Sequence, residues 1–244
     1  MGNIFSYDSK VMRALMYVGD MIILNILFLI CSIPLVTIGA AQTGLYTGIR
    51  VLQDPEDDSS PAAAFFKGFA NGFLKITLVW VCFMFLFVFL AFSLVPAMAS
   101  VAESSEIWAA YAQIPHVPPV LSAIALVLCE LLYNMLVMFH TRFNCSLAQL
   151  FRNSVLMTLA HPLRSILAAG FMCIPFLVLV YNFYLFMQIT PVFAAVGFCG
   201  LSMLSFGLLN KPFRGLINDT TKAAAEQTEA KTLTESEEPV NESV

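Results

Sequence analysis

The sequence predicts an all-α integral membrane protein, a polytopic bundle of transmembrane helices, and three observations support this fold class. Of the 244 residues, 59% are hydrophobic and only 11% are charged, whereas soluble domains carry about 25% charged residues. The mean hydropathy is +0.81. Several uncharged runs are also long enough to cross a bilayer, whose hydrocarbon core takes about 20 helical residues. This composition excludes an ordinary water-soluble enzyme, a disordered chain and a disulfide-stapled secreted domain.

Apolar runs between charged residues predict five full spans. Pro34 and Gly39 interrupt the first run, and Glu130 is the single charge in the third. The run 165–210 is long enough for two spans, and Gln188-Ile189-Thr190-Pro191 is the turn expected between them. The predicted full spans are about 20–38, 76–100, 120–140, 165–187 and 190–210.

The segment 40–53 predicts a short sixth pass. Ala40, Gly44 and Gly48 recur every four residues, so they share one face of a helix. Such a stripe of small residues lets another helix approach closely. Fourteen helical residues reach about 21 Å, which is short for a crossing and long for a loop. Whether the segment crosses, re-enters or lies on the membrane stays open at this stage.

The placement of charges favours six passes with both termini in the cytoplasm. If the chain turns back near Gly39, all twelve Lys and Arg residues lie on one face of the membrane, and the opposite face carries only Glu103 and Glu106. This is the bias that the positive-inside rule describes. The sequence thus divides into a transmembrane domain, 1–216, with a net charge of +1, and a tail, 217–244, with −5. We expect this acidic, cytoplasmic tail to be disordered.

Two cytoplasmic segments have the pattern of amphipathic helices that lie in the membrane interface. In the first, Ser60 and Pro61 are suited to a helix start, and Phe65, Phe69 and Phe73 follow at a spacing of four. The second begins with a capping box, Ser146 to Gln149, and His161-Pro162 ends it.

Glu130 is the candidate functional residue inside the membrane. A charge at this depth costs at least ~2.5 kcal/mol, so the side chain should face the bundle interior. Asn134 lies one turn later on the same face, and Asn25 and Asn182 are further candidate partners from neighbouring helices. Two interpretations remain open, a proton or substrate site and a polar clasp that fixes helix packing.

Signals for other chemistry are weak. The three histidines, His116, His140 and His161, lack the spacing of metal ligands, and the six cysteines stand singly. The sequence shows no motif of a hydrolase, a metalloprotease or a nucleotide-binding loop, and no basic domain that would bind nucleic acid. We therefore expect no enzyme, no cofactor, no metal and no nucleic-acid partner.

The first span and its exit carry a motif, Asp20-x4-Asn25-Ile-Leu-x3-Cys31-Ser-Ile-Pro34-Leu-Val-Thr37-Ile-Gly39-Ala40. It resembles the opening signature of the YesL-like family, small bacterial membrane proteins grouped as a domain of unknown function. Two later segments are similar too, Phe65-Phe66-Lys67-x-Phe69-x-Asn71-x-Phe73 and the series Arg142-Phe143, Arg152-Asn153-Ser154, His161-Pro162-Leu163-Arg164. The resemblance covers about residues 5–215.

The resemblance implies a multi-pass protein of the plasma membrane of Gram-positive-type bacteria. Genes of this family often lie beside those of carbohydrate-uptake ABC systems, which implies an accessory role in sugar import. The resemblance brings no catalytic or binding residues. It also fits a physical role for three residues of the motif: Pro34 breaks the helix, Thr37 satisfies a freed carbonyl, and Gly39 allows the turn back into the membrane.

Two functions follow as hypotheses. In the first, the chain is a non-enzymatic accessory or scaffold protein whose surfaces for partners, such as ABC permease subunits, are the Ala40/Gly44/Gly48 stripe and the two amphipathic helices. In the second, it is a small secondary transporter built on Glu130, Asn134 and the broken helix at 34–39. The lipid bilayer is a partner in both, and the sequence leaves open whether the chain forms a homo-oligomer.

Overall fold

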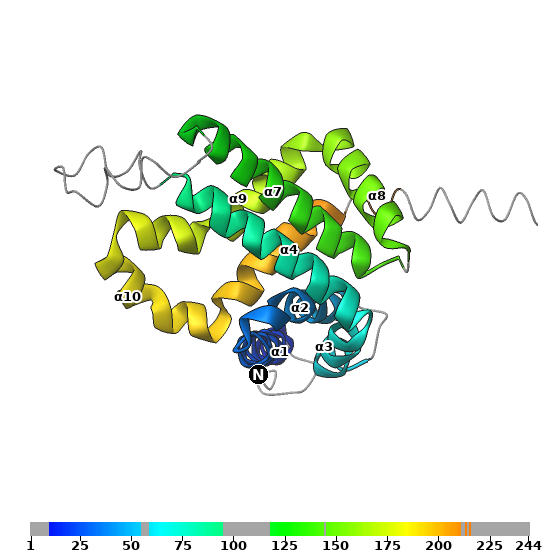
Figure 1. The fold of residues 1–244 in the computed structure, drawn as a ribbon. Coiled ribbons are helices and arrows are strands. Elements are labelled where there is room, and N and C mark those ends of the chain that lie inside the picture. The colour runs from blue at the N-terminus through cyan, green and yellow to red at the C-terminus, as the bar shows by residue number, and fades with distance from the viewer. Residues whose placement is uncertain are drawn as a thin grey trace, which may run out of the picture.

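The computed structural model describes residues 10–54, 59–94, 118–143 and 145–210, together with Phe213 and Gly215. Within these residues the secondary structure is entirely helical, which confirms the predicted all-α class. Figure 1 shows α4 and α7 running side by side, while α1 is seen nearly end-on beneath them. The helices are α1 (Lys10–Cys31), η1 (Leu35–Thr37), α2 (Ile38–Leu52), α3 (Pro61–Ala70), α4 (Phe73–Phe92), α7 (Pro119–His140), α8 (Leu147–Ala160), α9 (Pro162–Tyr181), α10 (Phe183–Val192) and η2 (Phe193–Gly197).

The first helix starts and ends earlier than the predicted span 20–38. It ends at Cys31, three residues before Pro34, because proline cannot donate the backbone hydrogen bond that would continue the helix. The chain then turns through residues 32–37. The Thr37 hydroxyl lies 2.6 Å from the Cys31 carbonyl and 2.8 Å from the Pro34 carbonyl. This confirms the predicted role of Thr37 in satisfying carbonyls freed by the break.

The second helix, α2, forms a tightly packed hairpin with α3. A Cβ atom built on Gly44 would lie 2.8 Å from the Phe65 carbonyl oxygen, and one on Gly48 would lie 3.1 Å from that of Pro61. A Cβ atom built on Gly68 of α3 would lie 3.1 Å from the Cα of Gly44. Such backbone-to-backbone contact requires residues without side chains at these positions.

The predicted interfacial helix around Phe65 is therefore half-buried against α2. Phe65 is fully buried, whereas the neighbouring Phe66 is 53% exposed. Phe65 stacks on Phe69 of α3, which in turn contacts Phe73 at the start of α4, so the three rings of the predicted aromatic stripe form a continuous row across the two helices. Pro61 occupies the first helical turn as predicted, but the Ser60 side chain makes no capping hydrogen bond.

The core lies between α2, α4, α7 and the helical segment 198–210, which follows η2 and is called the last helix below. Tyr133 of α7 packs against Trp80 and Phe83 of α4, with ring centroids 5.3 and 5.4 Å apart. Gly72 starts α4 with a φ of +64°, which favours glycine, and a Cβ there would meet the His140 ring at 2.8 Å. The largest fully buried side chains include Tyr46, Phe65, Phe206, Phe213, Met135 and Leu136.

The start of α8 is as predicted. The Ser146 side chain accepts a hydrogen bond from the Gln149 amide, and the Gln149 side chain accepts one from the Ser146 amide, which confirms the capping box. At His161 the chain turns by 105° into α9. Pro162 then stands in the first turn of α9, where its missing N–H group costs nothing.

The turn in the run 165–210 lies earlier than predicted. We expected it at Gln188–Pro191, but these residues are helical, and the chain turns at Asn182 instead. The Asn182 side chain accepts a hydrogen bond from the Leu185 amide at 3.0 Å and so caps α10. Pro191 is accommodated inside a helix that continues through the π-helical turn η2 to Asn210.

Four described helices are long and apolar enough to cross a membrane, and a fifth span is possible if the bent pair of α8 and the first part of α9 counts as one. The four are Val11–Cys31, Phe73–Phe92, Pro119–His140 and Tyr184–Asn210. Large apolar side chains cover their outer faces; Leu74 is 81% exposed and Val120 is 74% exposed. The acidic tail, Glu103 and Glu106 lie outside the described residues.

Candidate functional site

Glu130 and Asn134 meet in a hydrogen-bonded group that connects α7 with α2. The Asn134 amide donates to the Glu130 carboxylate at 2.6 Å and to the Glu130 backbone carbonyl at 3.1 Å. The Tyr46 hydroxyl, on α2, donates to the amide oxygen of Asn134 at 3.2 Å. Tyr46 is fully buried and Asn134 is 2% exposed. The predicted pair is therefore present, and Tyr46 is a third member that the sequence did not indicate.

Aromatic and small side chains enclose this polar group. The Tyr133 hydroxyl is buried and has no hydrogen-bond partner among the described residues. Ser205, on the last helix, lies beside the Tyr46 hydroxyl and donates to the Ala168 carbonyl of α9 at 3.3 Å. The group thus lies where α2, α7, α9 and the last helix meet, which suits a packing clasp as well as a binding site.

The two buried tyrosines allow a matched test of this group. We expect Tyr46→Phe to lower the free energy of unfolding by about 1 kcal/mol, because it leaves the Asn134 oxygen without its donor. Tyr133→Phe should be neutral or stabilising, because it removes a buried hydroxyl that no described group pairs. Unfolding of both variants in mixed detergent micelles measures the difference. Equal effects at the two positions would contradict the network.

Asn25, the third predicted member, lies elsewhere. Its amide donates to the backbone carbonyls of Phe193 at 3.2 Å and Ala194 at 2.7 Å, and its oxygen accepts from the Cys199 amide at 2.9 Å. The expectation that Asn25 partners Glu130 is therefore wrong. Asn25 instead joins α1 to η2, where the π-helical turn has freed these backbone groups.

The helix-break motif is built partly as predicted. Thr37 bridges the break after Cys31, and the Trp80 indole donates to the Leu35 carbonyl at 2.7 Å, which ties the turn to α4. Gly39, however, lies inside the first turn of α2 and makes no turn itself. A Cβ there would lie 2.6 Å from the Cβ of Trp80, so Gly39 is required for close packing against α4.

The small-residue stripe faces the interior of the chain. Ala40 is fully buried, and Gly44 and Gly48 are buried as well. Gly44 packs against Phe65 of α3, and Gly48 packs against Leu24 of α1, whose Cδ2 would lie 2.5 Å from an added Cβ. The stripe is therefore occupied by α1 and α3 and is not available to a partner protein.

Basic side chains gather where α7 ends. Arg50 donates to the Thr141 carbonyl at 3.3 Å, and Lys75 donates to the Cys145 carbonyl. The Arg142 guanidinium donates to Asn210 at 2.6 Å and lies over the Phe206 and Phe213 rings at 5.3 and 5.2 Å. His140 contacts the Asn71 carbonyl at 3.0 Å. Arg50, Lys75 and Arg142 thus share one end of the fold, in keeping with the predicted charge asymmetry.

Several cavities lie away from Glu130, and two of them flank η2 and α8. One of about 300 Å³ is almost entirely apolar and lies beside η2. A larger one of about 720 Å³ opens between α7 and α8, and its lining includes Phe139, Phe143, Gln149, Asn153 and Leu156. Neither lining contains a carboxylate. In the part of the chain that the structure describes, no three His, Cys, Asp or Glu side chains converge in a way that could hold a metal ion.

The helices are long and apolar, their outer faces expose large hydrophobic side chains, and their polar groups are buried between them. These features define a multi-pass helical membrane protein. Residues 21–94 match the model of a family described as protein of unknown function, DUF624, which includes the YesL-like proteins. The resemblance found in the sequence is thus confirmed over α1–α4, the part with the helix-break motif and the α2–α3 hairpin. No curated protein and no solved structure matches the chain.

Proposed function

We propose that the chain is a non-enzymatic accessory or scaffold protein of a bacterial plasma membrane, associated with an ABC-type carbohydrate uptake system. The observation that carries this proposal is that polar side chains of the helices form hydrogen bonds within the chain. Asn25, Thr37 and Asn134 each bond to another part of the chain. Their geometry serves helix packing, which favours a structural role over chemistry inside the membrane.

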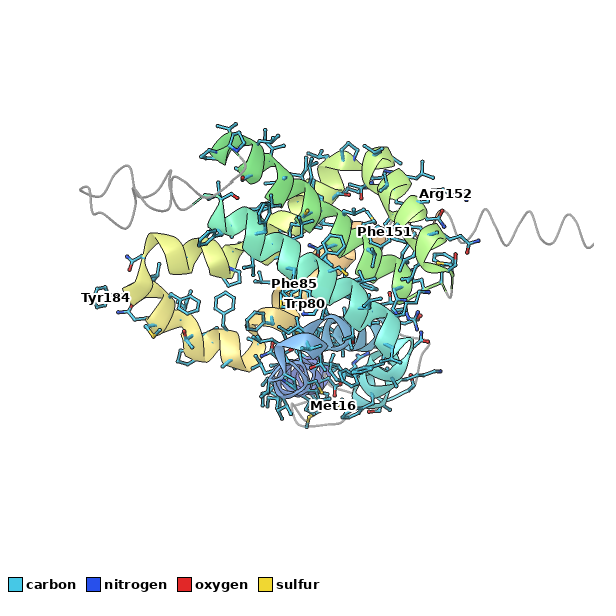
Figure 2. The ribbon with its side chains drawn as sticks, viewed as in Figure 1. Met16, Trp80, Phe85, Phe151, Arg152 and Tyr184 are labelled. Atoms are coloured by element: carbon cyan, nitrogen blue, oxygen red, sulfur yellow. The ribbon has the colours of Figure 1, made fainter. Side chains whose placement is uncertain are left out.

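The α8 helix provides the surface that this role requires. Its capping box fixes where it starts, and this start follows directly on Cys145, whose carbonyl accepts a hydrogen bond from Lys75. Arg152 projects from its outer side (Figure 2). Five apolar side chains of α8 are exposed, namely Leu147, Phe151, Val155, Leu156 and Leu159, the last of them by 71%. We propose that this α8 face, and not the buried stripe of α2, contacts permease subunits.

Co-purification tests the accessory role. The tagged full chain, expressed with its neighbouring genes and extracted in mild detergent, should recover ABC permease subunits. Because Leu156 and Leu159 are the most exposed apolar residues of α8, we expect Leu156→Ser with Leu159→Ser to reduce that recovery at least about tenfold, as a lost apolar contact of ~1.4 kcal/mol or more would. Leu74→Ser, on the outer face of α4, is the matched control and should leave it unchanged.

Recovery of the chain without any permease subunit would contradict the accessory role. Equal losses in the α8 variant and in the Leu74 control would show that exposed apolar residues act only through the lipid, and would remove α8 as the contact surface.

The Glu130 group supports a second candidate, a small secondary transporter. A carboxylate hydrogen-bonded near broken helices is how transporters build sites, and the chain has breaks at residues 32–37 and at Asn182. In liposomes, a transporter of this kind should drive proton-coupled solute uptake that Glu130→Gln abolishes. Flux that is absent, or is unchanged in the variant, would exclude this candidate.

A further inference from the structure

A cavity of about 470 Å³, lined in part by two cationic side chains, lies where α2, α3 and α7 end, apart from the Glu130 group and from α8. Its lining includes Thr47 and Arg50 from α2, Lys67 from α3, Asn71 after α3, and Thr141 at the end of α7. The cavity thus joins segments up to 94 residues apart in the sequence, and its lining includes two cations, two threonines and one asparagine.

Among the described residues, the charges that line this cavity are all positive. They are those of Arg50 and Lys67, and no described Asp or Glu lines it. The carboxylates nearest in the sequence are Asp54, which does not line the cavity, and those at 56–58, outside the described residues. Each cation alone would be explained by its place in the last turn of a helix, where positive charge is favourable. That explanation does not account for their convergence on one cavity.

The cavity is also held in shape. Arg50 donates to the Thr141 carbonyl, which fixes its side chain between α2 and α7 and leaves further guanidinium donors available. Gly68 allows α3 to approach Thr47 so closely that a Cβ at Gly68 would lie 2.6 Å from the Cβ of Thr47. The Asn71 carbonyl contacts His140. Arg50 and Lys67 are therefore presented by three helix ends that pack on one another.

The geometry points to a binding site for a phosphate ester group. The guanidinium of Arg50 and the ammonium of Lys67 are donor groups that proteins use for phosphate oxygens. The site lies at the basic end of the fold, beside Lys75 and Arg142, and basic pockets between membrane helices bind anionic lipid headgroups. The phosphate can come from such a headgroup or from a soluble phosphate ester, and this site is independent of the proposed accessory role.

Two titrations of the full chain in maltoside detergent test the site and separate the sources. Native mass spectrometry with dioleoyl phosphatidylglycerol, against dioleoyl phosphatidylcholine, measures headgroup binding. Calorimetry with inorganic phosphate and glycerol 3-phosphate measures binding of the soluble group. Saturable binding in the first titration alone identifies a lipid headgroup, and binding in the second identifies a soluble phosphate ester. Either result supports the site.

The variants decide whether binding occurs in this cavity. We expect Arg50→Gln and Lys67→Gln each to weaken binding about fivefold, as a basic residue near the phosphate layer does. Lys67→Arg should retain affinity, which separates loss of charge from loss of folding. Arg152→Gln removes an exposed cation on α8, outside the cavity, and should change affinity less than twofold. No binding in either titration, or equal weakening by Arg152→Gln and Lys67→Gln, would overturn the proposal.

Discussion

Replacing Gly44 by alanine should lower the free energy of unfolding by about 2 kcal/mol, although alanine is the better helix former by ~1 kcal/mol. The added methyl group would lie 2.8 Å from the Phe65 carbonyl oxygen. A backbone atom inside α3 cannot move aside as a side chain can, so α2 and α3 would have to separate. A larger residue, Gly44→Leu, should prevent the hairpin from closing and sharply reduce the yield of folded protein.

Gly19 provides the matched control for this prediction. It also lies inside a helix, α1, but a Cβ there would meet no atom within 4 Å. Gly19→Ala should therefore show only the gain in helix propensity, up to about 1 kcal/mol. Unfolding by sodium dodecyl sulfate in mixed micelles measures both variants. If Gly44→Ala were as stable as Gly19→Ala, the close contact of α2 with α3 would be disproved.

Replacing Asn25 by alanine is expected to be the second severe change, with a loss of about 2–4 kcal/mol. The substitution would leave the carbonyls of Phe193 and Ala194 and the amide of Cys199 without the side chain that pairs them. Inside a membrane no water replaces it, so the cost of unpaired backbone groups is higher than at a wet surface. The readout is the thermal unfolding temperature in maltoside detergent.

Asn182→Ala serves as the comparison for Asn25. Asn182 also bonds a backbone amide, that of Leu185, but it does so at an exposed helix start. Its loss should cost only the usual ~1 kcal/mol of a helix cap. We expect Asn25→Ala to lower the thermal unfolding temperature more than Asn182→Ala does. An equal or smaller effect at Asn25 would mean that its hydrogen bonds to η2 do not stabilise the fold.

Features set by local spacing could be predicted from the sequence. The capping box from Ser146 to Gln149 depends on residues three apart, and it is present as predicted. The break after Cys31 follows from Pro34, and the Thr37 hydroxyl reaches carbonyls three and six residues away. The contact of Asn134 with Glu130 follows from one helical turn. In each case a few neighbouring residues fix the geometry.

Features that depend on distant contacts could not be predicted in this way. The spacing of Gly44 and Gly48 indicates that a helix approaches, but not whether it belongs to the same chain. Asn25 is 168 residues from Phe193. The turn lies at Asn182 rather than at the segment that ends in Pro191, because that segment stays helical and leads into the π-helical turn η2. Tyr46 reaches Asn134 across 88 residues. Only the three-dimensional packing of helices decides these pairings.

The central claim is that the small-residue face of α2 is occupied by other helices of the same chain, and a double-mutant cycle between Gly48 and Leu24 tests it most directly. A Cβ on Gly48 would lie 2.5 Å from the Leu24 Cδ2, so Gly48→Ala should be destabilising by itself and largely tolerated when Leu24→Ala makes room. We predict a favourable coupling of about 1 kcal/mol in the free energy of unfolding. Additive effects, within about 0.5 kcal/mol, would contradict the claim and leave this face of α2 open to a partner.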